Sequence, residues 1–259
     1  MAAELVSRTD GQTLILTLQG AGGQHTLGPD VYAAGIEALN GAERNSDVRS
    51  VVLTGAGGLF SAGGDLVRLQ ASRALEEQAQ AAGVDGLHDW VETLRTHPKP
   101  VVAAVEGVAA GAGCALALAC DFIVAARNAR FVLAYGRVGL SPDGGASWAL
   151  AQALPRMLAS EWLMLGDALP AERLHTLGLV NRLADPGAAL VGALELCAAL
   201  HERPANVLAS VKELLAEAPT NDLHAQLARE RAHFVANLRH ANAGEGIAAF
   251  LDKRAPRFR

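Results

Sequence analysis

Aromatic residues are scarce in this 259-residue sequence, since Phe, Trp and Tyr together make up only 4% of it. Hydrophobic residues nevertheless account for 51%, so a folded core has to be built mainly from Ala, Leu and Val. Small side chains allow backbones to pack closely, which suits a helix-rich fold. The length permits one large domain, or one domain with an appended region.

Cysteine is also scarce. The three cysteines are Cys114, Cys120 and Cys197. An odd number at this spacing favours neither a disulfide framework nor a metal site. We therefore expect buried, reduced thiols and no bound metal. The first ten residues contain no apolar core, so we expect no signal peptide and a cytoplasmic protein.

Excess positive charge and long apolar runs are both absent. The formal net charge is −5, and no basic stripe is visible, so we expect no nucleic-acid partner. The longest uncharged apolar run, residues 107–120, has 14 residues. A membrane-spanning helix needs about 20, so we expect no membrane partner.

What the sequence does contain is a central stretch at residues 100–121. Its apolar run 101–105 predicts a buried strand, residues 107–113 are small, and residues 114–119 favour an apolar helix. A strand, a small-residue turn and a helix direct free backbone N–H groups at whatever lies in front of the turn. The stretch predicts half of an oxyanion hole, or otherwise a tightly packed strand–helix joint.

Residues 51–65 repeat this plan. A strand over 51–53 leads into a glycine-rich loop, and Asp65 is placed to cap another helix. Two such turns with exposed amides can hold one anion between them.

The remaining pattern predicts strands and helices in alternation, followed by helices alone. We expect strands at 4–8, 12–18, 48–54, 122–126, 130–133 and 179–183, and helices at 29–40, 65–82 (ending at Gly83), 86–96, 144–153, 156–166 and 170–177. Beyond residue 186 the pattern favours helices broken near Pro204, Pro219 and Gly244.

Five motifs in order carry a resemblance to a known family. They are Phe-Ser-Ala-Gly-Gly-Asp (60–65), Lys-Pro-Val-Val-Ala-Ala-Val (99–105), Ala-Ala-Gly-Ala-Gly-Cys (109–114), Gly-Leu-Ser-Pro-Asp-Gly-Gly (139–145) and Glu-Gly-Ile-Ala-Ala-Phe-Leu-Asp-Lys-Arg (245–254). Together they resemble the crotonase (enoyl-CoA hydratase/isomerase) superfamily, and most of all its phenylacetate-pathway ring-epoxide isomerase branch.

The resemblance implies an α/β fold: a crotonase-like spiral of β-β-α units over residues 1–185, with a C-terminal helical trimerisation region over 186–259. It implies an acyl-CoA thioester substrate, with coenzyme A arriving as part of the substrate and no permanently bound cofactor. It also implies a homotrimer or a dimer of trimers.

By motif match, the amides of Ala62 and Ala112 are the two donors of the oxyanion hole. Losing one such donor costs about 3–4 kcal/mol. Hydratases of the family use two glutamates, which would fall at Ala115 and Tyr135. Neither residue can act as a carboxylate base, so we expect this chain to be a poor hydratase.

Asp143 is the acid that remains. One carboxylate here can move a proton between two carbons, as a double-bond or ring isomerase requires; its structural alternative is a cap on the following helix. A competing branch, the aryl-CoA dehalogenases, carries an aspartate nucleophile at position 143, a histidine at His88 and a tryptophan where Tyr135 stands. Hydrolysis by the same nucleophile, and a catalytically silent CoA-ester binder, are further alternatives.

Coenzyme A binding leaves weaker traces. The resemblance assigns the adenine pocket to the backbone around Ala62, Gly64, Asp65 and Leu66. It also assigns Phe250 and Lys253 to contacts with the coenzyme A of a neighbouring subunit. The loop Gln24-His25-Thr26-Leu27 departs from the family's Asn-Ala-Leu motif, which puts that contact in doubt.

Overall fold

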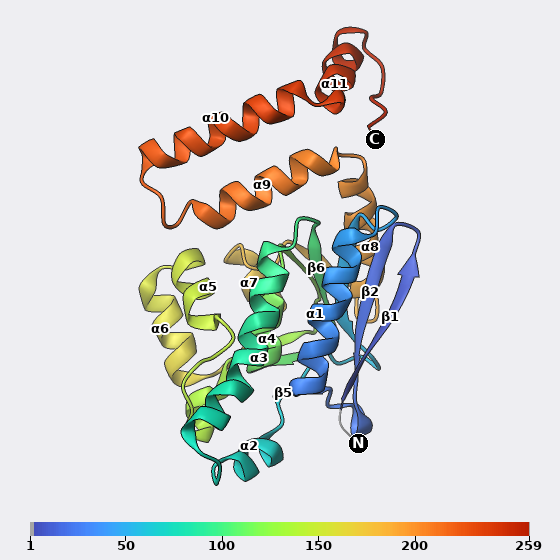
Figure 1. Cartoon of the computed structure of the whole chain (residues 1–259). Helices are drawn as coiled ribbons and strands as arrows, with labels where there is room; N and C mark the ends of the chain where they lie inside the picture. Colours follow the sequence, from blue (N-terminus) through green and yellow to red (C-terminus); the bar gives the residue numbers. More distant parts are fainter. Residues whose placement is uncertain (1–2, 259) are drawn as a thin grey trace.

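A six-stranded sheet forms the centre of the fold in the computed structural model, which describes residues 3–258 (Figure 1). Its strands follow the order β1-β2-β4-β6-β8-β11. The bounds are β1 Glu4–Asp10, β2 Thr13–Gln19, β4 Ser50–Gly55, β6 Val101–Val105, β8 Phe122–Ala126 and β11 Arg182–Ala184. The strands expected at 4–8 and 12–18 are confirmed as the antiparallel pair β1–β2, and the other neighbours are parallel.

Two small sheets lie beside the main one. Strands β7 (Val108–Ala110), β9 (Arg130–Val132) and β10 (Ala168–Pro170) form the first, and β3 (Thr26–Leu27) pairs with β5 (Gly63–Gly64) in the second. The sequence β6, β7, α4 (Ala112–Ala119) is one of the expected β-β-α units. Part of the small-residue stretch predicted as a turn is therefore a strand.

Both faces of the main sheet are covered, which explains the near-continuous apolar runs of its inner strands. Leu16, Leu53 and Ala103 point to the face packed by α1 (Pro29–Arg44), α3 (Glu77–Thr96) and α4. Val52 and Val102 point to the opposite face, which is covered by α8 (Ala189–His201). The first helix beyond residue 186 thus packs on the central sheet.

The helices before the central strand differ from the prediction. A short helix α2 (Leu66–Ser72) ends early, and α3 then runs without interruption through Gly83 and Gly86. Tertiary packing explains the second glycine, because a Cβ added at Gly86 would lie 3.3 Å from Tyr32 Cδ2. The predicted cap is confirmed, since Asp65 accepts hydrogen bonds from the amides of Val67 and Arg68 at 2.9 and 3.1 Å.

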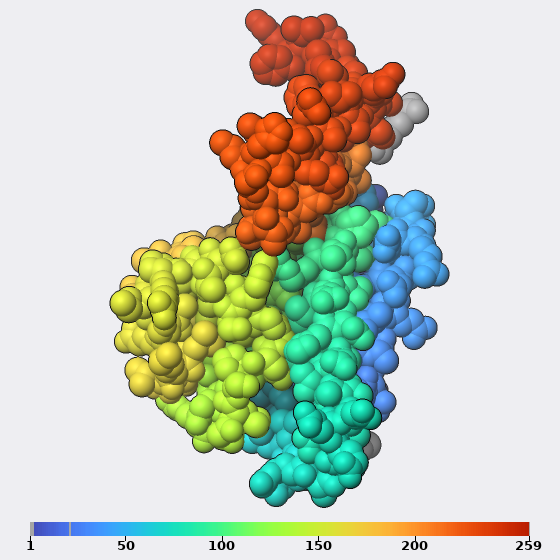
Figure 2. All heavy atoms as spheres, turned by 60° about the vertical axis from the view of Figure 1, so that its left-hand side comes forward, coloured from blue at the N-terminus to red at the C-terminus, as the bar shows by residue number. Residues whose placement is uncertain are grey.

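Three short helices flank the site region: α5 (Ala146–Ala153), α6 (Arg156–Leu165) and α7 (Ala171–Thr176). The last three helices, α9 (Ala205–Glu217), α10 (Leu223–Arg239) and α11 (Ala241–Leu251), form a layer that stands apart from the core (Figures 1 and 2). Of the three short helices, α7 corresponds to the helix predicted at 170–177 and is slightly shorter than predicted.

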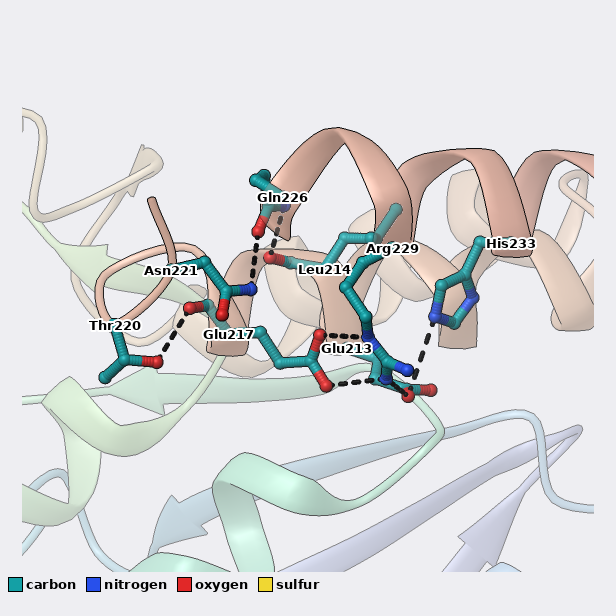
Figure 3. Close-up of polar contacts among 8 residues, drawn as sticks. All are labelled: Glu213, Leu214, Glu217, Thr220, Asn221, Gln226, Arg229 and His233. Atoms are coloured by element: carbon teal, nitrogen blue, oxygen red, sulfur yellow. Dashed lines mark hydrogen bonds and ion pairs between the residues drawn. The ribbon is translucent and has the colours of Figure 1, made fainter. Parts of the chain in front are cut away.

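Charged side chains hold α9 and α10 together. Arg229 on α10 donates to Glu217 at 2.6 Å and to Glu213 at 2.7 Å, and His233 Nε2 lies 3.5 Å from Glu213 Oε1 (Figure 3). The core anchors α9 through Lys212, whose Nζ lies 2.6 Å from Asp121 Oδ2 and 3.2 Å from the carbonyl oxygen of Lys99. Neither α9 nor α10 has a buried residue within the single chain.

The three cysteines are unpaired, and Cys114 and Cys197 are buried as predicted, whereas Cys120 is only partly buried. Within residues 3–258, no helix is both long enough and apolar enough to cross a membrane.

Candidate active site

Hydrogen bonds join the two glycine-rich turns predicted from the sequence. The Ser61 amide donates to the carbonyl oxygen of Val108 at 3.0 Å, and the Ala110 amide donates to that of Ser61 at 2.9 Å. Gly63, with φ of +85°, lies against the second turn so closely that an added Cβ would sit 2.5 Å from Ala110 O and 3.2 Å from Ala112 N. The backbone after β4 and the start of α4 therefore form one continuous surface.

The amide of Ala112 lies at the start of a helix. Ala112 is the first residue of α4, after Gly111 with φ of +49° and ψ of −124°. An amide at this position has no intrahelical acceptor, and the helix contributes a positive field there. Ala112 is not among the non-glycine residues with positive φ, so alanine is accommodated at this position without backbone strain.

The prediction for Ala62 as the second donor is wrong. Its amide donates to the carbonyl oxygen of Gln24 at 2.9 Å, so it is engaged by the neighbouring loop. The next amide, that of Gly63, donates to Ser61 Oγ at 3.1 Å. Gly64 is the next residue along the turn, and it lies in the short strand β5.

His25 holds the loop that engages Ala62, and sequence reasoning missed this role. It is buried and has φ of +49°. Its Nδ1 accepts a hydrogen bond from the Gly20 amide at 2.9 Å, so Nε2 carries the proton that is donated to the carbonyl oxygen of Ala56 at 2.7 Å. The signal in the sequence was the departure of the loop at residues 24–27 from the motif that the resemblance led us to expect there.

Asp143 and Tyr135 are brought together. The Tyr135 hydroxyl donates to Asp143 Oδ1 at 2.7 Å. Burial raises the pKa of Tyr135, and the charge of Asp143 raises it further, so the phenol stays protonated and acts as a donor. Tyr135, which cannot itself act as a carboxylate base, thus orients the predicted acid Asp143.

The alternative role of Asp143 as a helix cap is not what the structure shows. Helix α5 begins at Ala146, its N-cap is Gly145, and no side chain caps it. Only the backbone carbonyl oxygen of Asp143 takes part, accepting from the Ala146 amide at 3.2 Å. The carboxylate is therefore available to the site.

The turn after Asp143 packs against Ala115, where a hydratase would carry its first glutamate. Ala115 is buried, and a Cβ added at Gly144 would lie 3.0 Å from Ala115 Cβ and 3.3 Å from Leu87 Cδ2. No carboxylate takes part in this contact.

Tyr32 is a further residue near the acid that sequence reasoning missed. It is buried on α1, and burial raises its pKa; the positive charge of Arg68 lowers that pKa and the negative charge of Asp143 raises it. An aromatic residue on an amphipathic helix gave no signal beyond core packing.

His88 is not brought together with Asp143. It is exposed on α3 and lines a cavity of about 310 Å³ together with Gly144, Gly145, Arg95 and Trp148. Asp143 does not line this cavity, and no hydrogen bond or ion pair joins the two residues within the described chain. The position of His88 does not support the catalytic role expected for it.

The residues expected around coenzyme A lie at two distant places. Ala62 and Leu66 are exposed near the N-terminus of α2, the helix that Asp65 caps. Phe250, 83% exposed, and Lys253 lie at the end of α11, at the opposite end of the molecule from α2 (Figures 1 and 2). Within one chain these two groups cannot bind the same molecule of coenzyme A.

Among residues 3–258, no group of three or more His, Cys, Asp or Glu side chains is arranged to hold a metal ion.

Comparisons with known proteins identify the family of this chain. Residues 14–259 match the model of the enoyl-CoA hydratase/isomerase family. The chain is 35% identical to 1,2-epoxyphenylacetyl-CoA isomerase of Escherichia coli K12, covering 98% of this chain and 97% of that protein. It is 31% identical to 2,3-dehydroadipyl-CoA hydratase of the same strain, covering 99% of both. The crystal structure of an enoyl-CoA hydratase from Polaromonas sp. JS666 superimposes with a TM-score of 0.97 and 59% identity, covering 99% of this chain and 100% of that one.

Proposed function

This chain belongs to the enoyl-CoA hydratase/isomerase family and is a CoA-thioester enzyme, and we propose that it is an isomerase using Asp143 as its single acid–base group. The observation that carries the proposal is the hydrogen bond from Tyr135 to Asp143. Tyr135 stands where a hydratase would have its second glutamate, and Ala115 stands where it would have the first.

The thioester oxygen binds the amide of Ala112 at the start of α4. For the second donor we propose the amide of Gly64, because those of Ala62 and Gly63 already donate to Gln24 and Ser61. Two donors aimed at this oxygen stabilise the negative charge that develops when the neighbouring carbon loses a proton.

The proton transfer then needs only one carboxylate. Asp143 accepts the proton as the C–H bond breaks, the electron pair moves into the enolate, and the neutral acid returns the proton to a different carbon of the same acyl group. Tyr135 holds the carboxylate in place by donating to Oδ1. No water is consumed, and no covalent intermediate forms.

The alternatives receive less support from the site. A dehalogenase or hydrolase would need a base that activates water beside Asp143, and His88 makes no hydrogen bond or ion pair with Asp143 in the described chain and lines a cavity that Asp143 does not line. A silent binder would not require the arrangement seen at Asp143, whose carboxylate does not cap α5 and accepts a hydrogen bond from the buried Tyr135 hydroxyl. The relative named as an isomerase matches nearly the full chain, which supports the same choice.

We predict that the protein hydrates crotonyl-CoA slowly but isomerises a 3-enoyl-CoA and exchanges its protons with D₂O. The reason is that Ala115 and Tyr135 cannot hold and activate water. Absorbance at the thioester band measures both reactions, and NMR measures the exchange. A hydration rate at or above the enzyme median of about 10 s⁻¹, without isomerisation, would contradict the proposal.

We also propose that the protein assembles as a homotrimer or a dimer of trimers. Several large apolar side chains of the last three helices are exposed, namely Leu215, Leu223, Phe234, Phe250 and Leu251. One of them, Phe234, also lines a groove of about 880 Å³ between α9, α10 and α11. A monomer rarely leaves so much apolar surface uncovered.

Light scattering should therefore give three or six times the chain mass of 26.8 kDa. Phe234→Glu is expected to lower this mass, because it buries a charge in the subunit contact. Arg239→Glu, an exposed change at the end of the same helix, serves as the charge control. A wild-type mass of one chain would overturn the proposal.

A further inference from the structure

Arg68 carries a guanidinium group without a partner in the described part of the chain. Its Nε atom is buried and makes no hydrogen bond. No carboxylate of the described residues lies within the 4.0 Å of an ion pair with it. A buried donor without an acceptor destabilises a fold, so each one calls for an explanation.

The side chain of Arg68 extends from α2 into the space between α1 and α3. A Cβ added at Gly28, just before α1, would lie 3.9 Å from Arg68 Nε, and one added at Gly83 on α3 would lie 3.9 Å from Arg68 Nη1. Both neighbours are glycines, so no side chain from these two positions covers the guanidinium.

The same side of α3 leads from Arg68 to the acid of the candidate active site. One turn along the helix, Tyr32 packs over Gly86, and Leu87 contacts the turn at Gly144 that follows Asp143. Residues 83 and 87 are about 6 Å apart along the helix axis. Arg68 therefore contacts α3 about one turn before Leu87, the residue that contacts the turn following Asp143.

Electrostatics agrees with this placement. The pKa of Tyr32 is raised by burial, lowered by the charge of Arg68 and raised by the charge of Asp143. Tyr32 is thus within range of both charged groups, and its hydroxyl makes no hydrogen bond to the described chain that would occupy it.

The other unpartnered buried donor is explained by packing. Trp90 Nε1 has no acceptor, but its ring presses against α1 so closely that a Cβ at Gly35 would lie 2.2–2.6 Å from ring atoms. No ligand fits in that contact, whereas Arg68 is flanked by two glycines at ordinary contact distance.

We propose that Arg68 binds an anionic group of the acyl-CoA substrate, a carboxylate at the end of the acyl group remote from the thioester. A guanidinium pairs with a carboxylate through two parallel hydrogen bonds, and the Tyr32 hydroxyl supplies a further donor. The 3′-phosphate of coenzyme A offers the same anionic chemistry from the other end of the substrate. The inference deepens the proposed function, but it rests only on acyl-CoA binding and not on the isomerase step.

Binding calorimetry with non-reactive thioether analogues tests it. Two analogues of equal acyl length are compared, one ending in a methyl group and one in a carboxylate, with the wild type, Arg68→Met and Arg68→Lys. We expect Arg68→Met to weaken binding of the carboxylate analogue by about 10–100-fold, as for a lost hydrogen bond to a charged group. Arg68→Lys should restore part of it, and the methyl analogue should bind all three proteins alike.

Arg73→Met is the matched control. Arg73 is exposed at the end of the same helix, so this substitution removes the same charge at a position away from the site. Equal weakening of both analogues by Arg68→Met, with no such difference when both are built on 3′-dephospho-CoA, would show that Arg68 binds the 3′-phosphate. That result would support anion binding by Arg68, with the phosphate in place of the acyl carboxylate. Equal affinity of wild type and Arg68→Met for every ligand would overturn the proposal.

The melting temperature without ligand gives an independent readout. Removing an unpaired guanidinium should leave it unchanged or higher, whereas a structural arginine would lower it when lost. A clear drop in Arg68→Met would therefore refute the ligand role. Failure of the isomerase assay would leave these binding results unchanged, so the two proposals fail separately.

Discussion

Replacing Asp143 by asparagine should lower isomerase turnover by about 10²–10⁴-fold, the range for losing a general base. The amide is nearly isosteric with the carboxylate, and Tyr135 can still donate to its oxygen. Thioester binding should therefore remain close to that of the wild type. Steady-state kinetics with a 3-enoyl-CoA and calorimetry with a non-reactive thioester measure the two effects.

Two further variants make this result specific. Tyr135→Phe should give a smaller fall, about 10–100-fold, because it removes one hydrogen bond to a charged group but leaves the carboxylate in place. His88→Ala should retain wild-type turnover, since His88 is exposed on α3 and has no contact with Asp143 among the hydrogen bonds and ion pairs of the described chain. Full isomerase activity in Asp143→Asn would end the assignment of this acid.

A nucleophilic role for Asp143 predicts a different outcome. Repeated turnover in H₂¹⁸O would then place the label in the carboxylate of the wild type, and His88→Ala would accumulate a covalent adduct visible by mass spectrometry. We expect neither, and either one would favour the dehalogenase or hydrolase.

The second large effect is expected for Ala112→Pro, which should lower turnover by about 10²–10³-fold. Proline is well tolerated at the first position of a helix, and Ala112 occupies that position in α4. The substitution thus removes the N–H donor to the thioester oxygen while the helix is retained. The expected loss is that of one oxyanion-hole donor, about 3–4 kcal/mol.

Ala112→Gly is the matched control, because it keeps the amide and changes only the side chain. Its turnover should stay within several-fold of the wild type. Circular dichroism and the melting temperature establish that α4 is intact in both variants. Near-normal turnover in a folded Ala112→Pro would show that this amide does not bind the thioester oxygen.

The local parts of the site could be predicted from the sequence. The strand-to-helix turns follow from short apolar runs ending in glycine, and the cap at Asp65 follows from a carboxylate before a helix. The helix expected over 114–119 is present and begins two residues earlier, at Ala112. These signals lie within a few residues of the feature they determine. The motifs in order were specific enough to indicate the family.

Contacts between distant residues could not be predicted in the same way. The amide of Ala62 is turned away from the site by a carbonyl oxygen at Gln24, which His25 holds in place. Helix α3 continues through Gly83 and Gly86, and Tyr32 of the neighbouring α1 packs against Gly86. The acceptor of a backbone amide, and whether a glycine is needed for close packing, both depend on which atoms lie opposite. Sequence spacing does not contain that information.

The acid and its surroundings show the same division. The sequence by itself determined that two glutamates are missing and that Asp143 is the remaining acid. Only the tertiary structure decided that Tyr135 donates to it, that His88 lies elsewhere and that Arg68 lies unpaired on the same side of α3. The physical reason is that residue identity limits which chemistry is possible, whereas hydrogen bonds and ion pairs form only between groups that the packing of separate helices brings within about 3–4 Å.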